Sequence, residues 1–403
     1  CIHDYHASPS KESLEEAGEE ARFRASFSVK RALEDSKKVP SAIPAGLDWS
    51  RFAAPLIVGW YGTETAGDKA ILGNIVKKLL AANKNSRITV ASLYPFVTRR
   101  TLRELGVDAA IVKTFSAEYL QACESADAVI MGGGPLMGME PLGFVLEAFL
   151  TARRFDIPAI VEGCGIGPLS EKAHISAVKE ILRLSASIKV RDTASLAWVV
   201  ENTARIDAVC SGDPAVDFVE RWKKETPPGP AASKEKYLAC FLREITTEYA
   251  NGMGPDDFAG FKKNFEDELG KMVLYLREKT GLKPLFMPMH TFVIGNDDRD
   301  FMRRFVKTYF KDHEYELGDK VYSPQDILSA MSGSGFNLCM RFHSVLFADT
   351  LGVPFVAIDY TGGGKIKGYL KDRQREELKI DRADLAEGRW RKAVDSALLP
   401  EGF

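Results

Sequence analysis

Residues 55–72 read PLIVGWYGTETAGDKAIL: an apolar run, a glycine-bearing loop and the start of a helical pattern. The run from Pro55 to Gly59 has the length and the apolar content of a buried strand. Glycines in the loop let backbone N–H groups approach a ligand closely, and a helix N-terminus favours an anion. One such loop is weak evidence for a site, because many α/β folds need glycine at this turn for packing alone. The stretch therefore predicts a β-α unit and leaves a binding role open.

The same alternation of apolar runs and helical patterns continues through two parts of the chain. In the first part the strand-like runs lie at residues 55–59, 87–93, 109–112, 127–131, 157–162 and 187–190. In the second part they lie at residues 237–242, 284–289, 336–340 and 354–358, with a long helical pattern at about 256–279. Such alternation favours a parallel, doubly wound sheet in each part. We predict two Rossmann-like domains with a ligand cleft at the carboxyl ends of both sheets.

Changes in composition divide the chain. Residues 1–50 are rich in Lys, Glu, Ala and Ser and lack a strong apolar stripe, which predicts an N-terminal helical arm and linker. Residues 51–223 then form the N-terminal Rossmann-like domain. The proline-rich stretch at residues 224–235 predicts a linker, and residues 236–403 form the C-terminal Rossmann-like domain.

Composition and charge limit the class of protein. Of 403 residues, 45% are hydrophobic and 27% are charged, as in soluble globular proteins. The formal net charge of -2 gives no reason to expect nucleic acid as a partner, and no apolar run has the character of a transmembrane segment. The six cysteines are scattered, several of them in apolar runs, which favours a reducing compartment. We expect a cytoplasmic protein, one that could work at the inner face of a membrane, and leave assembly into a homo-oligomer open.

Two more glycine-rich loops follow apolar runs of the first domain, at residues 132–134 and 163–167. Three such strand ends on one sheet edge are harder to explain by packing than one, since glycine leaves no side chain between backbone and cleft. The loops give these candidates for the cleft: Gly62, Thr65, Gly67, Gly133, Gly134, Gly165 and Gly167.

The second domain has its own chemistry-bearing positions at strand ends. Arg341 and His343 are two residues apart, so in an extended chain they would share one face, where a cation and an imidazole suit anion binding and proton transfer. A salt-bridged arginine beside a core histidine is the alternative. Arg243 closes the run 237–242 and would face the cleft, although an ordinary surface arginine fits its spacing almost as well. His290 follows the run 284–289, where a loop histidine with satisfied hydrogen bonds is the favoured alternative. No histidine or cysteine spacing indicates a metal site.

The chain resembles the polysaccharide pyruvyl transferase family, whose members join a ketal-linked pyruvate to a glycan using phosphoenolpyruvate. The resemblance covers about residues 56–370 and rests on four ordered stretches. They are the loop at 59–72, the glycine loops at 132–134 and 163–168, the element IKVRDTAS at 188–195 with SGDPA at 211–215, and MRFHS at 340–344 with the run to Tyr360. Two positions depart from the family: Thr65 stands where asparagine is usual, and Lys69 where an acidic residue is usual. Both changes bear on the acceptor.

The resemblance implies a GT-B-like arrangement, with the acceptor held mainly by the first domain and the donor by the second. It implies phosphoenolpyruvate as donor substrate without a further cofactor, and a glycan or lipid-linked saccharide as acceptor. Two catalytic candidates follow: His343 as general acid or base, and Asp68 to orient or deprotonate an acceptor hydroxyl. The candidates for donor binding are Arg243, Arg341, His290 and Ser344. The rival functions are a nucleotide-sugar glycosyltransferase of the same architecture and a catalytically silent glycan-binding homologue.

Overall fold

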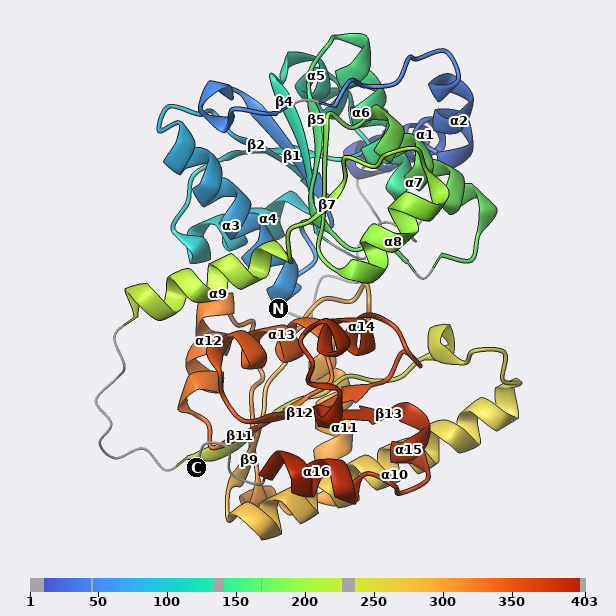
Figure 1. The fold of residues 1–403 in the computed structure, drawn as a ribbon. Coiled ribbons are helices and arrows are strands. Elements are labelled where there is room, and N and C mark those ends of the chain that lie inside the picture. Colours follow the sequence, from blue (N-terminus) through green and yellow to red (C-terminus); the bar gives the residue numbers. More distant parts are fainter. Residues whose placement is uncertain (1–10, 45, 134–140, 168, 227–235, 399–403) are drawn as a thin grey trace.

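The computed structural model describes residues 11–44, 46–133, 141–167, 169–226 and 236–398, and side chains from residue 17 onward. The chain forms two separate parallel sheets, stacked one above the other in Figure 1. Each sheet is flanked by helices on both faces, so the two doubly wound domains expected from the sequence are present.

The N-terminal sheet has seven strands in the order β3-β2-β1-β4-β5-β6-β7. Its strands are β1 (Pro55–Gly59), β2 (Thr89–Ser92), β3 (Ala110–Lys113), β4 (Ala128–Gly132), β5 (Ala159–Cys164), β6 (Ser187–Val190) and β7 (Val209–Cys210). The helices that follow them are α3 (Ala66–Ala82), α4 (Pro95–Leu105), α5 (Ala117–Ser125), α6 (Leu142–Arg154), α7 (Lys172–Leu184), α8 (Thr193–Asn202) and α9 (Pro214–Glu225).

The C-terminal sheet repeats this order with six strands, β10-β9-β8-β11-β12-β13. Its strands are β8 (Tyr237–Phe241), β9 (Lys283–Phe286), β10 (Glu316–Leu317), β11 (Phe336–Cys339), β12 (Phe355–Asp359) and β13 (Lys379–Asp381). Its helices are α10 (Pro255–Thr280), α11 (Asp298–Tyr309), α12 (Pro324–Gly333), α13 (Phe342–Leu351), α14 (Lys365–Asp372), α15 (Arg382–Ala386) and α16 (Arg391–Leu398), with short 3₁₀ turns between them. Ser323 and Asp326 form a capping box at the start of α12.

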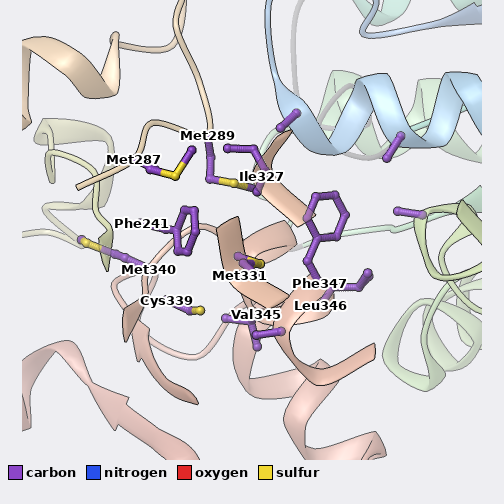
Figure 2. Packing of buried hydrophobic residues seen from close by; sticks show 14 of the residues in the cluster. Phe241, Met287, Met289, Ile327, Met331, Cys339, Met340, Val345, Leu346 and Phe347 are labelled. Carbon is purple, nitrogen blue, oxygen red and sulfur yellow. The ribbon is translucent and has the colours of Figure 1, made fainter. Parts of the chain in front are cut away.

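Burial explains why these strands read as unbroken apolar runs. Every residue of β1, β4 and β5 is buried, because helices cover both faces of a parallel sheet. Leu56 and Val58 point into one core, whereas Ile57 points into the other, which is continuous with the core of the C-terminal domain. Figure 2 shows the methionine-rich part of that second core, where Met287 and Met340 flank Phe241.

The segment before β1 is more than a peripheral arm. It forms α1 (Lys11–Ser26) and α2 (Val29–Ser36), and α2 buries Val29 and Ala32 against the N-terminal domain. Phe27 between the two helices is buried in the same core. Residues 29–36 therefore pack with the N-terminal domain, although their apolar stripe is short.

The two domains meet through helices and loops rather than through a shared sheet. Helix α9 ends the N-terminal domain and packs against both α3 and α13, so it lies between the domains in Figure 1. Lys223 near its end donates to the carbonyl oxygen of Thr350 at 2.9 Å. The expected linker begins inside α9, and its residues 227–235 lie outside the described part of the chain. No helix among the described residues combines the length and the apolarity needed to span a membrane.

Candidate active site

The strand order places a crevice in each domain. In the first sheet the order reverses between β1 and β4, and in the second between β8 and β11. Ligands of open α/β sheets bind beyond the carboxyl ends of the strands at such a reversal. The loop into α3 follows β1, Arg243 lies just beyond β8, and Arg341 follows β11. The predicted candidates thus come from the strands that flank both crevices.

His343 lies on the first turn of α13 and reaches the N-terminal domain. Its ring contacts the backbone of Gly67 on α3, where a Cβ atom would overlap the imidazole. Its Nε2 atom is 3.7 Å from Oδ2 of Asp213, an ion-pair distance that is too long for a hydrogen bond. Asp213 caps α9 by accepting from the backbone N–H of Ala215. The glycine on α3 therefore makes room for a histidine of the other domain beside a buried carboxylate.

Arg191 follows β6 and brings a buried cation to the same place. Its guanidinium donates to Asp192 at 3.1 Å, lies 3.7 Å from Asp213, and stacks 4.5 Å above the ring of Phe342. A Cβ atom on Gly165 would overlap this guanidinium. The missing side chain of Gly165 therefore leaves space for Arg191 at the cleft. Burial alone would raise the pKa of Asp213, but His343 and Arg191 hold that pKa below its ordinary value.

Lys365 is the first residue of α14 and follows three glycines. Asp359, at the end of β12, shapes this turn by accepting from the backbone N–H groups of Thr361 and Gly363. Burial lowers the pKa of Lys365 to about 8, and the charge of Arg191 adds to that effect, whereas Asp68 and Asp213 oppose it. No ion pair or hydrogen bond joins its amine to another described residue. Lys365 is a cation near a helix N-terminus, within electrostatic range of two buried carboxylates.

Asp68 lies in the first turn of α3 and faces the same region. The residue is 4% exposed, and no described residue hydrogen-bonds its Oδ1 atom. Burial raises the pKa of Asp68 to about 6, although His343 and Lys365 act in the opposite direction. A Cβ atom on Gly133 would lie 3.4 Å from this oxygen, so the second glycine loop borders the carboxyl. Asp68 can change protonation state close to neutral pH.

Several buried polar atoms in this region have no hydrogen-bond partner among the described residues. They are Tyr61 Oη, Asp68 Oδ1, Asp213 Oδ2 and His343 Nε2. Folded proteins rarely leave such groups unsatisfied, because each costs its full desolvation free energy. Cations and carboxylates from both domains converge here with spare hydrogen-bonding capacity. The arrangement suits a polar, anionic ligand and proton transfer to or from it.

Arg243 lies close to the second crevice, 6% exposed. All the hydrogen bonds of its guanidinium go to uncharged groups: Tyr360 Oη at 2.9 Å, Tyr249 Oη at 3.2 Å and the carbonyl oxygen of Glu244 at 3.3 Å. Both tyrosine rings also lie within cation–π distance. The surrounding phenols raise the pKa of Arg243, against the effect of burial. A buried guanidinium without a carboxylate partner among the described residues is well suited to an anionic ligand.

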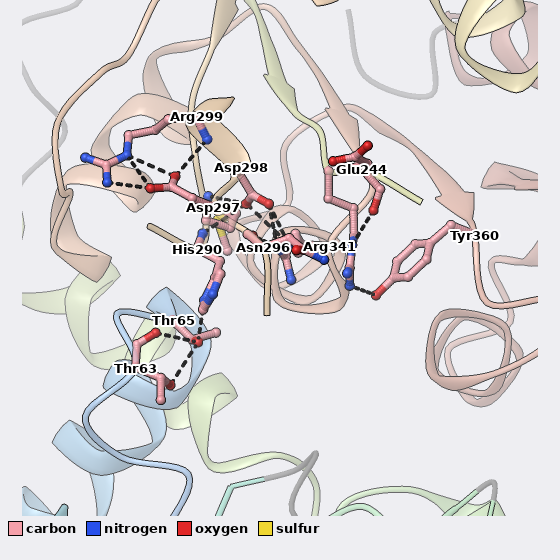
Figure 3. Close-up of polar contacts among 12 residues, drawn as sticks. Thr63, Thr65, Glu244, His290, Asn296, Asp297, Asp298, Arg299, Arg341 and Tyr360 are labelled. Atoms are coloured by element: carbon pink, nitrogen blue, oxygen red, sulfur yellow. Dashed lines mark hydrogen bonds and ion pairs between the residues drawn. The ribbon is translucent and has the colours of Figure 1, made fainter. Parts of the chain in front are cut away.

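Arg341 is placed differently from the expectation. It is the N-cap of α13, so it does not share an extended face with His343, which belongs to the helix. Its guanidinium binds both carboxylate oxygens of Asp298, as Figure 3 shows. Ser344, another candidate for binding the donor substrate, is fully buried, and its hydroxyl donates a hydrogen bond to the carbonyl oxygen of Arg341. These contacts favour a supporting role for both residues in holding the helix start and the segment around Asp298.

His290 forms a contact between the domains. Its Nε2 atom lies 2.7 Å from the carbonyl oxygen of Ile294, so this nitrogen carries the proton, and Nδ1 accepts from Thr65 Oγ1 at 2.9 Å. Burial, reinforced by the charge of Arg341, lowers the pKa of His290 to about 4. The ring is neutral at pH 7. Thr65 is the N-cap of α3, yet its hydroxyl bonds His290 instead of capping the helix (Figure 3).

The remaining cleft candidates are backbone features. Gly62, Gly133 and Gly167 have positive φ angles of 96°, 94° and 85°, which side chains rarely tolerate. Gly134 lies outside the described residues.

Lys69, one of the two departures from the family pattern, is buried and pairs with Glu64 at 2.6 Å and Glu104 at 2.8 Å. That departure therefore belongs to an ion network within the N-terminal domain.

Sequence reasoning missed three members of the cluster around His343: Arg191, Asp213 and Lys365. Arg191 and Asp213 stand just after β6 and β7, and Lys365 follows the glycines at residues 362–364 after β12. The strand-end argument applied equally to Arg191, which directly follows a predicted strand. It could not select Asp213, because β7 is too short to recognise in the sequence, or Lys365, which lies six residues beyond the end of β12.

Comparisons with known proteins support the overall architecture. Among solved structures, the UDP-GlcNAc 2-epimerase of Neisseria meningitidis is 13% identical with a TM-score of 0.54, and covers 86% of this chain and 94% of its own. The epimerase of Methanocaldococcus jannaschii is 12% identical with a TM-score of 0.56, covering 86% and 93%. At such low identity these likenesses show the fold alone, and they confirm two Rossmann-like domains in a GT-B-like arrangement. No curated protein sequence matches the chain.

A comparison with family models matches residues 66–362 to the model described as polysaccharide pyruvyl transferase. The matched region contains most of the residues at the two crevices, including Asp68, Arg191, Asp213, Arg243 and His343. The chain therefore belongs to the polysaccharide pyruvyl transferase family.

Proposed function

We propose that this protein transfers the pyruvyl group of phosphoenolpyruvate to two hydroxyls of a glycan or glycan precursor, forming a ketal and releasing phosphate. The observation that carries the proposal is the buried cluster around His343, where Arg191, Lys365 and two carboxylates meet at the domain boundary. Phosphoenolpyruvate has a phosphate and a carboxylate, which need cations. Family membership supports this chemistry over that of a sugar-nucleotide transferase.

The proposed reaction balances in atoms and charge. The methylene carbon of the donor gains a proton, which makes the phosphate-bearing carbon electrophilic. One acceptor hydroxyl adds there, the carbon–oxygen bond to phosphate breaks, and the second hydroxyl closes the ketal. Of the two hydroxyl protons, one replaces the proton given to the methyl group and the other leaves with phosphate. The chemistry thus needs a group that gives a proton and a group that takes one.

The structure offers residues for both tasks. His343 is proposed to protonate the donor, because its Nε2 is buried, has no hydrogen-bond partner in the described part of the chain and lies beside Asp213. Asp68 is proposed to accept a proton from an acceptor hydroxyl, since its carboxyl is ionised above about pH 6 according to its raised pKa. The two residues come from different domains. Turnover then requires both domains to be in contact, with the acceptor on the α3 side.

Cations for the donor come from two places at the crevices. Lys365 and Arg191 belong to the cluster around His343, and Arg243 lies just beyond the neighbouring strand β8. Arg341 is bound to Asp298, so we assign it a positioning role instead of a first contact with the donor. We propose that different cations hold the phosphate and the carboxylate of the donor.

The test is phosphate release from phosphoenolpyruvate in the presence of candidate glycan acceptors. His343→Ala should lower turnover by ~10²–10⁴-fold, the usual contribution of general acid–base catalysis, while the melting temperature and calorimetric donor affinity change little. His313→Ala, at an exposed histidine, is the matched control and should behave as wild type. Turnover of His343→Ala within a few-fold of wild type would end the catalytic assignment. Consumption of a sugar nucleotide without phosphate release would instead favour the glycosyltransferase.

A further inference from the structure

An exposed apolar patch crosses the boundary between the two domains. Phe96 is 62% exposed on α4, and Val293 and Ile294 are 80% and 37% exposed in the loop after β9. The rings of Tyr94 and Phe292 join these two segments, with centroids 4.9 Å apart, and Phe96 lies 6.5 Å from Phe292. We call these five residues the rim patch. Monomeric proteins rarely gather exposed apolar side chains in one place without a use for them.

The same face of α4 carries free positive charge. Phe96, Arg99 and Arg103 are its exposed residues, and their spacing of three and four places them on one side of the helix. Neither Arg99 nor Arg103 forms an ion pair with a described residue, whereas Arg100 between them is bound to Glu64. Two cations with no counter-ion therefore flank the apolar patch.

The rim patch lies beside the contact that joins the crevices. Phe292 is two residues beyond His290, whose ring accepts from Thr65, and the backbone N–H of Leu93, next to Tyr94, donates to the carbonyl oxygen of Tyr61. A surface that holds the rim patch would consequently hold both domains at the edge of the candidate site.

We propose that the rim patch docks on an anionic lipid surface. Aromatic and aliphatic side chains beside unpaired arginines match the two parts of such a surface, since apolar groups enter the interface and arginines meet acidic headgroups. The overall charge of -2 gives no general attraction to acidic lipid, so the attraction must be local. The inference does not depend on the proposed reaction, because binding to lipid can be measured without turnover.

The test is flotation of the whole protein with vesicles of phosphatidylcholine alone or mixed with phosphatidylglycerol. Wild-type protein should float with the mixed vesicles and much less with the neutral ones. Replacing Arg99 and Arg103 together by serine should weaken binding by about fivefold for each arginine, and added salt should act in the same direction. Phe96→Ser should weaken binding by about tenfold, through loss of buried apolar area.

Phe155→Ser is the matched control. Phe155 is 56% exposed after α6, away from the rim patch, so its loss should leave flotation unchanged. All these positions are exposed, and the melting temperatures should stay close to wild type. Three outcomes would overturn the proposal: no flotation with acidic vesicles, equal loss in the Phe155 variant, or concentration-dependent dimerisation that Phe96→Ser abolishes. The last outcome would identify the patch as a contact between two copies of the chain.

Discussion

Burial disfavours the charged forms of Lys365 and Asp68, which shifts their pKa values in opposite directions. The pKa of Lys365 falls to about 8, so its amine is charged below that pH and neutral above it. The pKa of Asp68 rises to about 6, so its carboxyl is neutral below that pH and charged above it. Both groups carry the charges that the proposed reaction needs only between about pH 6 and pH 8. We therefore expect activity to be highest between about pH 6 and pH 8.

These two pKa values predict a bell-shaped dependence of kcat/KM on pH, with limbs near 6 and 8. Because arginine stays charged, Lys365→Arg should move the alkaline limb to higher pH and leave the acid limb in place. Lys367→Arg, at an exposed lysine of the same helix, should leave the profile unchanged. The measurement is phosphate release against pH at low donor concentration. An alkaline limb that stays near 8 in the Lys365 variant would show that another group controls it.

At the level of secondary structure, apolar periodicity predicted the longer strands, whereas β7, β10 and β13 were missed. Those strands have only two or three residues, which is too short to show a period. The strand-end rule likewise predicted that Arg243, Arg341 and the glycine loops lie near the crevices. It could not predict pairings between distant residues, such as Arg341 with Asp298, because a side chain's partner depends on the packed fold. That is why His343 was expected beside Arg341 but lies beside Asp213.

A carboxylate of α13 shows how one helix positions another. Asp349 has a side chain that is 1% exposed and accepts from Tyr369 at 2.8 Å, Arg373 at 2.9 Å and Arg375 at 2.7 Å. These donors lie in the last turn of α14 and just beyond it, and Lys365 begins the same helix. Asp349 therefore fixes the far end of the helix that presents Lys365 to the cleft.

Asp349→Ala should lower the stability of the C-terminal domain by about 1.5–3 kcal/mol, the usual contribution of hydrogen bonds to a charged group. The loss should not reach that of a fully buried ion pair, because Arg373 and Arg375 are 55% and 39% exposed and can be solvated. A looser α14 should also raise the KM for the donor more than it lowers kcat. Asp384→Ala, which breaks an exposed ion pair with Arg389, should change neither the stability nor the KM. An unchanged KM in a destabilised Asp349 variant would limit the residue to folding.

For the whole molecule, contacts at the site itself join the two domains, in addition to the packing of α9 against α13. Gly67 contacts His343, Thr65 binds His290, and the backbone N–H of Ala66 donates to the carbonyl oxygen of Met289 at 2.9 Å. The imidazole rests against the backbone of α3 and covers that part of the helix. We infer that the domains must separate to admit a glycan and close again for proton transfer, as hinged enzymes do.

Gly67→Ala tests this coupling between shape and activity. Within a helix, alanine is favoured over glycine by about 1 kcal/mol, so the change should stabilise α3 if nothing opposed it. Its Cβ atom would overlap the ring of His343, however, and the domains should stay apart. We expect a larger radius of gyration by small-angle scattering, folded domains, and little phosphate release. Removing the ring as well, in Gly67→Ala with His343→Ala, should restore the compact shape without restoring turnover. Gly260→Ala, where a Cβ atom meets nothing within 4 Å, is the control. A compact and active Gly67→Ala variant would show that His343 can leave the interface without opening the molecule.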